Sequence, residues 1–385
     1  MRGLNSLWIS LAITASAVVA QSNSNSKVVE IGPDYNVLSE PFSREVDEPF
    51  SKTKSGSKTF ENIGEAAFIV YNKRFYDIIG TQPNLTVVAE KDFSFAHEAG
   101  IYVEKTNEIM FTSNRLGDTS GTDQYADVYK MSVDTFEVTK ISPSIDINLA
   151  NGGTFYDGKA IIVGQGKGSL GAAIYSVDPV TYETKVILNN FFGLKFNSLN
   201  DVAVSRKDGS FWFTDPSYGF EQKFRQQPQL GDFVYRWDPK TGDVRLVADG
   251  FVKPNGFQFS PDENIAYVSD TGFTTGVGQT DVKRPHTVYA FDVSRKSGGS
   301  VFLTNRRVFA LSDTGIPDGI KLDIKGNLYI GSGDGVNVYA PDGTLLGKIN
   351  TIKCANLVFA KDDLFILSEN KIYHTKLNTQ GVMLN

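Results

Sequence analysis

The sequence predicts an all-β fold, a six-bladed β-propeller with four-stranded blades. The first observation is a unit that recurs six times, in which a polar residue opens an apolar strand. The second is a tyrosine in a later strand pair of every copy, so two independent markers keep the same order and count. The third is the spacing of the openers, which runs from 38 residues (Asp318 to Asn356) to 63 residues (Asn255 to Asp318). This brackets the roughly 40 to 50 residues of propeller repeats.

The strand pattern within each copy supports this architecture. Short alternating apolar runs are separated by turn signals such as KDG, SPDEN and DPKTG, which indicates about four strands per copy. The body of the chain has no long helical period. Six sheets arranged radially around a channel satisfy the pattern. The openers are Glu98, Asn151, Asn200, Asn255, Asp318 and Asn356, and the tyrosines are Tyr129, Tyr175, Tyr235, Tyr289, Tyr339 and Tyr373.

The chain begins with the pattern of a secretory signal peptide over residues 1–20. A cationic start at Arg2 is followed by an apolar stretch and by small residues in a V-x-A arrangement that ends at Ala20. The stretch is too short and too interrupted by Ser and Thr for a membrane span, and no later segment approaches that length. We therefore expect cleavage after Ala20 and a secreted protein with no membrane partner.

Between the signal and the first opener the sequence changes character. Residues 21–60 are rich in Ser, Lys and Gly with weak periodicity, so we expect a loosely ordered arm. The propeller is expected over residues 61–385, with a strand-like pattern from Ala66 onward. Because the sixth copy has three obvious strands, the stretch from Leu85 to Glu90 is expected to supply its outer strand and close the ring, which removes an exposed sheet edge.

Composition and charge exclude several kinds of partner. The 385 residues are 41% hydrophobic and 21% charged, which is typical of a globular protein with a large core. The formal net charge is −6, so the chain lacks the basic surface that nucleic acid requires. The only glycosylation motif is Asn84-Leu85-Thr86, and the only cysteine is Cys354, which therefore has no internal disulfide partner. The sequence leaves open whether the protein forms a homodimer.

The openers are the part of this sequence that carries chemistry. The first strand of every blade lines the channel in the same direction, so the residues that open these strands converge at one end of it. Two carboxylates offset the charge of a divalent ion and two amides add neutral oxygens, which favours Ca²⁺ over zinc. A single P-N-G or P-D-G is more often a turn, but the shared position favours a site. The candidate metal ligands are Glu98, Asn200, Asn255 and Asp318.

The segments around these openers resemble the SMP-30/gluconolactonase/LRE-like family of six-bladed propellers. In detail they are similar to secreted fungal lactonohydrolases, and the likeness extends from about Phe68 to the C-terminus. The resemblance implies a calcium-dependent lactone hydrolase and places the family's metal ligands on the same four openers. In place of the Arg-x-Asn-Asp-Gly segment of animal members, this chain has Ser198 to Val202. The motifs that carry the likeness are HEA, NGGT, NSLNDV, KPNG and IPDG, which begin at His97, Asn151, Asn197, Lys253 and Ile316.

Hydrolysis of a lactone needs a base or nucleophile near the metal. Asp318 is expected to take this role, with His97 as the competing base. His97 also has a structural alternative, because neighbouring side chains on a strand point to opposite faces and Glu98 is expected to face the channel. Tyr218 is expected either to donate a hydrogen bond to substrate or to pack beside the pocket, and Asn151 is expected to contact substrate.

Other acidic residues near the openers have structural explanations. Asp215 and Asp270 lie at matching strand ends, where we expect them to cap turns. Asp201 follows a candidate ligand, so it is expected to be hydrogen-bonded within the fold or to lie near a second, structural ion. The runs from Gly164 and Gly331 open no helix and lack phosphate-loop spacing, which argues against a nucleotide site.

Two alternatives to a lactonase remain. An aryl-ester or organophosphate hydrolase could use the same metal site, because related propellers use similar ligands for those substrates. From a different class, a propeller can serve as a non-catalytic interaction platform, since fold does not fix function. No serine lies in a G-x-S-x-G elbow, which argues against an α/β-hydrolase mechanism.

Overall fold

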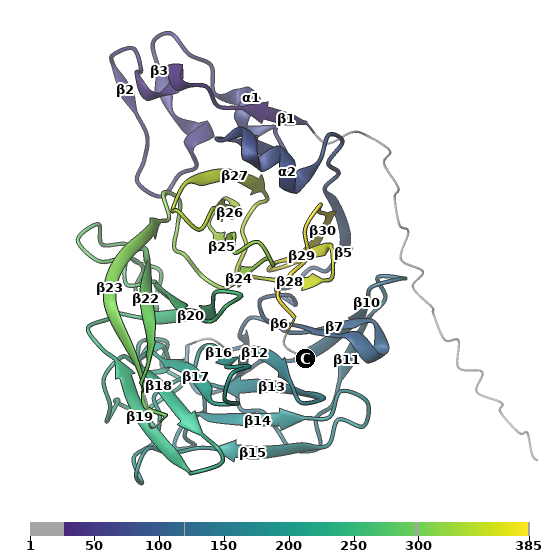
Figure 1. The fold of residues 1–385 in the computed structure, drawn as a ribbon, viewed down its shortest axis with the longest axis vertical. Helices are drawn as coiled ribbons and strands as arrows, with labels where there is room; N and C mark the ends of the chain where they lie inside the picture. The colour runs from purple at the N-terminus through teal and green to yellow at the C-terminus, as the bar shows by residue number, and fades with distance from the viewer. Residues whose placement is uncertain (1–26, 119, 297–298, 384–385) are drawn as a thin grey trace, which may run out of the picture.

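A computed structural model describes residues 27–118, 120–296 and 299–383 of the chain (Figure 1). The predicted signal peptide over residues 1–20 and the first part of the predicted arm lie outside these residues. Strands dominate the described part, and none of its helices is long and apolar enough to cross a membrane.

Six sheets arranged around a channel confirm the predicted six-bladed propeller. We number the blades in chain order and list the strands of each blade from the inner strand outward. Blade 1 comprises β6 (Glu98–Val103), β7 (Glu108–Thr112), β10 (Val128–Ser132) and β11 (Val138–Ile141). Blade 2 comprises β12 (Ala150–Tyr156), β13 (Lys159–Gly164), β14 (Ala173–Val177) and β15 (Thr184–Leu188). Blade 3 comprises β16 (Val202–Val204), β17 (Phe211–Asp215), β18 (Phe233–Asp238) and β19 (Asp243–Ala248).

The second half of the ring repeats this plan. Blade 4 comprises β20 (Pro254–Phe259), β21 (Ile265–Asp270), β22 (Thr287–Arg295) and β23 (Val301–Leu311). Blade 5 comprises β24 (Ile320–Leu322), β25 (Leu328–Ser332), β26 (Gly335–Tyr339) and β27 (Leu345–Asn350). Blade 6 comprises β28 (Asn356–Ala360), β29 (Asp363–Ser368), β30 (Lys371–Lys376) and β5 (Thr86–Glu90).

The outer strand of blade 6 comes from the N-terminal side of the propeller, as predicted. β5 pairs antiparallel with β30, and Lys371 lies opposite Glu90. On the inner side, β28 also contacts β6. The first and last blades are therefore joined at both edges, and the ring has no open seam between them.

The tyrosine marker lies in the third strand of every blade and packs against the second strand. Tyr129 on β10 lies opposite Phe111 on β7, and the two rings stack with centroids 5.8 Å apart. Tyr235 and Phe213 repeat this contact in blade 3 at 5.5 Å. Such cross-strand aromatic pairs contribute roughly 0.2–1 kcal/mol beyond alanine. The tyrosine recurs because each blade repeats the same packing position.

The described part of the N-terminal arm is folded, which corrects the prediction of loose order over residues 21–60. β1 pairs in parallel with β4, and β4 pairs with β27, so the sheet of blade 5 has six strands. Tyr35, Phe50 and Phe60 pack edge to face at 5.2 to 6.1 Å. These aromatic residues are separated in sequence by largely polar segments. The sequence therefore has no periodic pattern that would predict their cluster. The arm comprises β1 (Val28–Glu30), η1 (Pro33–Asn36), β2 (Phe42–Ser43), η2 (Phe50–Lys52) and β3 (Lys54–Ser55), and it is followed by α1 (Glu61–Gly64) and β4 (Phe68–Val70).

The stretch after β4 is helical where the sequence pattern predicted a strand. It forms the 3-10 helix η3 (Lys73–Phe75) and the short α-helix α2 (Tyr76–Ile79). The side chain of Asn72 caps this turn by accepting the Arg74 N–H at 3.0 Å. Ile78 and Ile79 are both buried. A short apolar run suits a strand or a helical turn equally, and here the cap decides between them.

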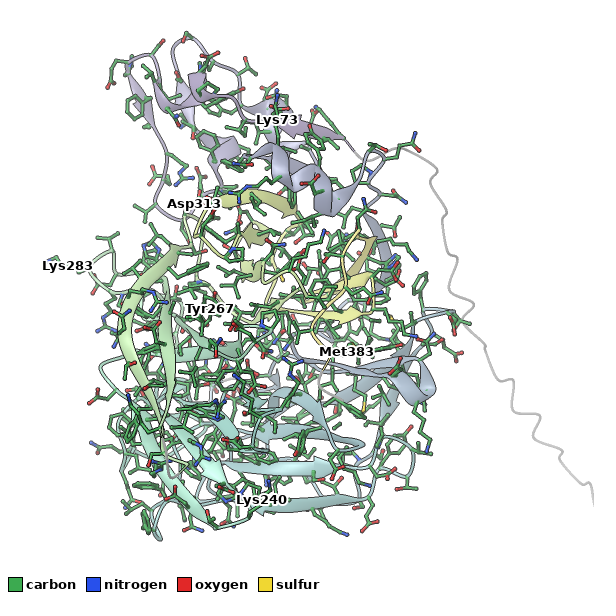
Figure 2. All side chains as sticks on the ribbon, in the orientation of Figure 1. Lys73, Lys240, Tyr267, Lys283, Asp313 and Met383 are labelled. Atoms are coloured by element: carbon green, nitrogen blue, oxygen red, sulfur yellow. The ribbon has the colours of Figure 1, made fainter. Side chains whose placement is uncertain are left out.

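The C-terminal residues pack at the end of the channel away from the openers. The N–H of Val382 donates to the carbonyl of Leu322, the last residue of β24, at 3.0 Å. The N–H of Gly381 donates to Lys361, just after β28, at 3.0 Å. In Figure 2, Met383 accordingly lies near the middle of the ring. The tail therefore covers the inner strands where they end.

Candidate active site

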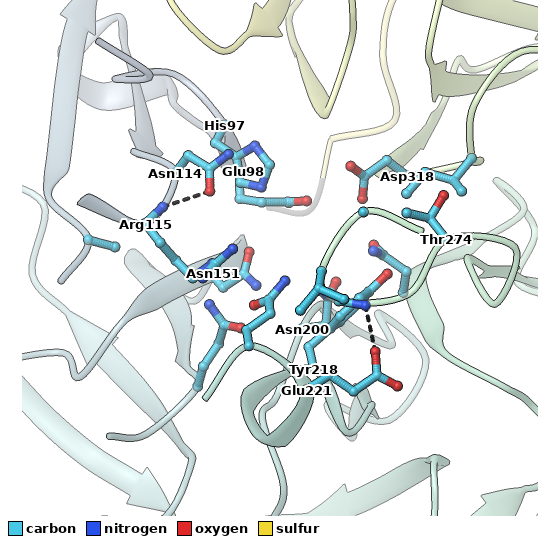
Figure 3. Close-up of a pocket in the computed structure, with 18 of the residues that line it drawn as sticks. His97, Glu98, Asn114, Arg115, Asn151, Asn200, Tyr218, Glu221, Thr274 and Asp318 are labelled. Atoms are coloured by element: carbon cyan, nitrogen blue, oxygen red, sulfur yellow. Dashed lines mark hydrogen bonds between the residues drawn. The ribbon is translucent and has the colours of Figure 1, made fainter. Parts of the chain in front are cut away.

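All residues predicted to be catalytic, metal-binding or substrate-binding line one cavity, of about 640 Å³, at the opener end of the channel (Figure 3). They come from the openings of five blades and from the helix α3 (Tyr218–Glu221), which follows β17. The structure therefore brings together side chains that are far apart in sequence. They are His97, Glu98, Asn151, Asn200, Tyr218, Asn255 and Asp318.

Close approach of the inner strands explains the glycine that follows several openers. A Cβ atom on Gly152 would lie 2.3 Å from the carbonyl oxygen of Asn200. One on Gly256 would lie 2.8 Å from the carbonyl oxygen of Asp318. Both distances are below van der Waals contact, so glycine is needed for one opener to reach the next. The N-G pairs thus bring neighbouring openers together.

Hydroxyl groups on the second strands hold the backbone of the next blade's opener. A threonine or serine near the end of the second strand donates to the opener's carbonyl oxygen in three cases. Since each bond crosses from one blade to the next, the positions of neighbouring openers are linked. The bonds run from Thr112 to Asn151 (3.2 Å), from Thr214 to Asn255 (2.7 Å) and from Ser269 to Asp318 (2.9 Å).

Three asparagine side chains leave buried oxygens without a protein partner. The Oδ1 atoms of Asn151, Asn200 and Asn255 are buried and accept no hydrogen bond from described residues. An unsatisfied buried carbonyl oxygen costs about 1–3 kcal/mol. Three such oxygens on the wall of one cavity are available to accept from water or substrate, or to bind a cation that all three could share.

The two acidic openers are desolvated beside each other. Glu98 is 2% exposed, and its Oε2 accepts from the amide of Asn356 at 2.5 Å, so the sixth opener orients the first. Burial, and then the charge of Asp318, raise the pKa of Glu98 well above its ordinary value. Burial also raises the pKa of Asp318 to about 6, against the effect of His97. A divalent cation would favour the ionised form of both carboxyls.

These residues fit a calcium ion better than a transition metal. Among the described residues no group of three or more His, Cys, Asp or Glu side chains could hold a metal. The available donors are instead carboxylate oxygens of Glu98 and Asp318 and the unsatisfied amide oxygens. Ca²⁺ accepts such a mixed set of six to eight oxygens in loose geometry, with water completing it.

His97 and Glu98 both line the cavity, which differs from the alternation expected of strand neighbours. The register of β6 with β7 shifts between Glu98 and Ile101, and Ala99 has a φ of 64°. An irregularity of this kind re-aims a side chain. His97 therefore belongs to the site and does not pack into the blade.

The ring of His97 is held by an ion pair. Its Nδ1 lies 3.1 Å from Oε1 of Glu369, which also receives the amide of Asn114 at 3.2 Å. Burial disfavours the charged imidazole, but the charge and hydrogen bond of Glu369, together with the charges of Glu98 and Asp318, outweigh burial and raise the pKa of His97 to about 9. Burial likewise opposes ionisation of Glu369, whereas the charge of His97 lowers its pKa to about 2. The pair fixes the orientation of the ring, which lines the cavity, and leaves Nε2 outside this bond.

Tyr218 lines the cavity and also packs. Its hydroxyl is hydrogen-bonded to that of Thr271, and the Nζ of Lys253 lies 5.7 Å from its ring centroid. Burial raises the pKa of Tyr218 far above its ordinary value, so the phenol stays protonated. Both predicted roles, donor and packing residue, are compatible with this position.

Asp201 is hydrogen-bonded within the fold. Its Oδ1 accepts from the N–H of Val202 at 2.8 Å and its Oδ2 from that of Phe257 at 3.0 Å. Asp201 is 2% exposed, and its bond from Phe257 joins blade 3 to blade 4. This favours the structural explanation over a second ion.

Sequence patterns did not predict a place in the site for the polar residues that follow the second strands. β7 runs antiparallel to β6, so its end lies beside the start of β6. Asn114 and Arg115, just after β7, consequently reach the cavity wall. Glu221, after β17, forms an ion pair with Lys253 at 3.0 Å and accepts the N–H of Gly276 at 2.5 Å. Antiparallel pairing was the available signal, because it brings both chain segments to one end of the channel.

Comparison with known proteins agrees with this architecture. The SMP-30/Gluconolactonase/LRE-like region matches residues 98–370. Lactonohydrolase oryL of Aspergillus oryzae is 31% identical over 367 residues, which cover 88% of this chain and 80% of that protein. The gluconolactonase of Zymomonas mobilis is 33% identical over 237 residues, which cover 58% of this chain and 62% of that protein.

Solved structures share the fold over most of its length. A putative gluconolactonase superposes with a TM-score of 0.65 at 25% identity, covering 82% of this chain and 99% of that one. A gluconolactonase from Xanthomonas campestris gives 0.64 at 26% identity, covering 80% and 94%. Together with the match over residues 98–370, these similarities show that the chain belongs to the SMP-30/gluconolactonase/LRE-like family.

Proposed function

We propose that this protein hydrolyses the ring ester of a lactone to the corresponding hydroxy acid, with one Ca²⁺ in the cavity. The observation that carries the proposal is the set of buried amide oxygens without described partners, in the same cavity as two carboxyls. A non-catalytic platform has no use for such a set. Relatives named lactonohydrolase and gluconolactonase support the choice of substrate. The proposed ligands are Glu98, Asn200, Asn255 and Asp318.

The side chains of the cavity divide the reaction between them. Bound Ca²⁺ would supply polarisation of the lactone carbonyl and stabilisation of the negative charge on its oxygen. Asp318 takes a proton from the water whose oxygen attacks the carbonyl carbon. The ring C–O bond then breaks, and the alkoxide receives the proton that Asp318 took from the water and becomes the hydroxyl of the product. His97, oriented by Glu369, faces the same space and is the second candidate for these proton transfers.

Two neutral groups are placed to orient the substrate. Tyr218 keeps its proton and offers an O–H donor on the cavity wall. Asn151 offers an amide whose oxygen has no described partner. We assign to both the positioning of the lactone, with the amide oxygen of Asn151 as an acceptor for a substrate hydroxyl.

Calcium binding tests the proposal directly. EDTA-treated protein is titrated with CaCl₂ by calorimetry, and turnover of pantolactone, aldonolactones and aryl esters is followed in a pH-stat. We expect EDTA to abolish lactone turnover and Ca²⁺ to restore it. Asn255→Ala should weaken calcium binding roughly tenfold or more, while the matched variant of an exposed residue, Asn189→Ala, should not.

Three results would count against it. Lactone turnover that survives EDTA removes the metal from the proposal. Equal calcium binding by Asn255→Ala and Asn189→Ala removes the ligand assignment. If the enzyme turns over aryl esters but no lactone, the proposed lactonase is wrong and the alternative, an aryl-ester hydrolase, takes its place.

We also propose that the mature protein is secreted and glycosylated at Asn84. The apolar stretch and V-x-A pattern before Gln21 support export, and Asn84 is an exposed residue before β5, outside the cavity. N-terminal sequencing of protein from the medium of a eukaryotic host should begin at Gln21. Asn84→Gln should remove the mass that peptide N-glycosidase removes. Retention of the protein inside the cell contradicts the export proposal.

A further inference from the structure

Arg115 places a positive charge on the cavity wall without a carboxylate beside it. Its Nη1 donates to the amide oxygen of Gln124 at 2.7 Å, and its guanidinium lies 6.0 Å from the ring centroid of Phe224. Within residues 27–118, 120–296 and 299–383, neither contact partner carries a charge, and the guanidinium has no ion pair. Figure 3 shows Arg115 and Asn151 on one side of the cavity and Asp318 on the other.

The contacts of Gln124 fix the position of Arg115. Gln124 is fully buried, and its amide nitrogen donates to the carbonyl oxygens of Gly121 at 2.7 Å and Gln222 at 3.0 Å. Its oxygen consequently faces Arg115. The short hairpin of β8 (Leu116–Gly117) and β9 (Gln124–Tyr125) holds the two residues together. The guanidinium of Arg115 is thus oriented by a neutral amide, which does not neutralise its positive charge.

Apart from Lys223 and Lys353, which are exposed, the other charged residues of the cavity are already accounted for. Glu221 is paired with Lys253, and His97 with Glu369. The carboxyls of Glu98 and Asp318 are the proposed metal ligands. Arg115 therefore stands outside every charge pair of the site that the described residues form, and burial lowers its pKa, which shows that its charge is partly desolvated. An anionic group on the substrate would give the guanidinium of Arg115 a counterion.

We propose that Arg115 binds a carboxylate substituent of the substrate, so that the preferred substrates are lactones that carry a carboxylate beside the ring ester. This inference rests on the proposed lactonase function and specifies its substrate class. A guanidinium presents N–H donors in a planar fork that matches a carboxylate, and Nε and Nη2 of Arg115 have no partner among the described residues. A neutral lactone leaves this desolvated charge without a counterion, whereas a lactone acid pairs with it.

Matched substrates test this inference. We compare two substrates with the native enzyme at saturating Ca²⁺. One is γ-butyrolactone with a carboxylate substituent on its γ-carbon, and the other is the corresponding primary amide, which has nearly the same shape and no charge. The carboxylate should have a higher kcat/KM by roughly tenfold to a hundredfold, mainly through KM, because a charged hydrogen bond is lost with the amide. Arg115→Gln should lower kcat/KM for the carboxylate by a similar factor and change that for the amide less than threefold.

Further variants assign the effect to this residue. Arg307→Gln removes an exposed arginine of β23 that pairs with Asp292, and it should leave both substrates unchanged. Lys223→Gln removes an exposed cation of the cavity rim, and the carboxylate preference should persist. Should Arg115→Gln fail to fold, Arg115→Lys keeps the charge without the planar fork and should retain only part of the preference.

The outcomes separate this inference from the proposed function. Equal kcat/KM for carboxylate and amide in the native enzyme overturns the inference and leaves the lactonase intact. Loss of the preference in Lys223→Gln but not in Arg115→Gln also overturns it. Failure to open any lactone, including unsubstituted γ-butyrolactone and pantolactone, overturns the proposed function itself.

Discussion

The opener of blade 4 is secured from within its own blade, whereas the opener of blade 5 is secured by the N-terminal arm. In blade 4, Asp270 at the end of β21 accepts the N–H groups of Val252 at 3.0 Å and Lys253 at 2.9 Å. These donors lie three and two residues before Asn255. Asp215 makes the equivalent bonds in blade 3, so both residues cap turns as predicted.

Blade 5 has no carboxylate at the corresponding place, because β25 ends in a serine. The N–H of Gly315, three residues before Asp318, donates instead to Oδ1 of Asp47 in the arm, at 2.9 Å. Arg44, also in the arm, donates to the side chain of Asp313 at 3.0 Å and to its carbonyl oxygen at 3.2 Å. The arm therefore supplies the cap that the blade lacks.

This difference separates two ways of holding a candidate ligand. The cap of blade 4 is part of the core, since Asp270 is fully buried. The cap of blade 5 lies at an exposed contact between segments far apart in sequence. Loss of the first should destabilise the whole blade, and loss of the second should mainly loosen the loop before Asp318. The arm is thus coupled to the residue that we propose as the base.

The largest effect is expected for Asp270→Ala. The N–H groups of Val252, Lys253 and Gly272 would lose their acceptor, and each buried unsatisfied group costs about 1–3 kcal/mol. The free energy of unfolding in urea should fall by about 3 kcal/mol or more. Asp270→Asn keeps one acceptor oxygen and should lose less. A loss below about 1 kcal/mol would mean that the two caps do not differ as described.

The propeller was predictable because its signals are local and repeated. Each opener, strand alternation and tyrosine recurs six times, so an error in one copy leaves the others to define the fold. The seven residues predicted for the site were likewise found at one cavity, because strand direction alone determines where the openers meet. Their chemical roles depend on distances to substrate and ion, which the sequence does not contain.

What the sequence could not show depends on single contacts. The bond of Asp47 to Gly315 joins residues 268 positions apart and belongs to no repeat. The position of Arg115 depends on the hydrogen bonds of Gln124. The position of His97 depends on the irregular backbone at Ala99. Periodicity carries no information on such contacts, since each occurs once.

An intermediate effect is expected for Asp47→Ala. Loss of this exposed hydrogen bond should reduce the free energy of unfolding by about 0.5–1.5 kcal/mol and lower calcium affinity several-fold, because the loop before Asp318 loses its cap. Calorimetry with CaCl₂ and urea unfolding measure the two quantities. Asp47→Asn retains an acceptor oxygen and should restore calcium binding. Glu48→Ala, the matched change next to it, should alter neither, and equal calcium affinities for Asp47→Ala and Glu48→Ala would remove the arm from the site.

The smallest effect concerns the pH dependence of the contact between Arg44 and Asp313. Burial raises the pKa of Asp313, but the charges of Lys348 and Arg44 outweigh burial and hold it below its ordinary value of 3.8. A depressed carboxyl pKa contributes stability above that ordinary value, and the contribution is lost as the pH falls through the depressed pKa.

Arg44→Gln should therefore be less stable than the native protein by about 0.2–1 kcal/mol near neutral pH, as expected of a partly exposed pair. Urea unfolding from about pH 6 to about pH 3 measures this difference, which should shrink below about pH 4 as Asp313 takes up its proton. Lys348, 2.6 Å from Asp313, remains in the variant, so part of the depression persists and the effect stays small. A difference that does not change with pH would show that Arg44 acts only through its bond to the carbonyl of Asp313, since that bond does not titrate.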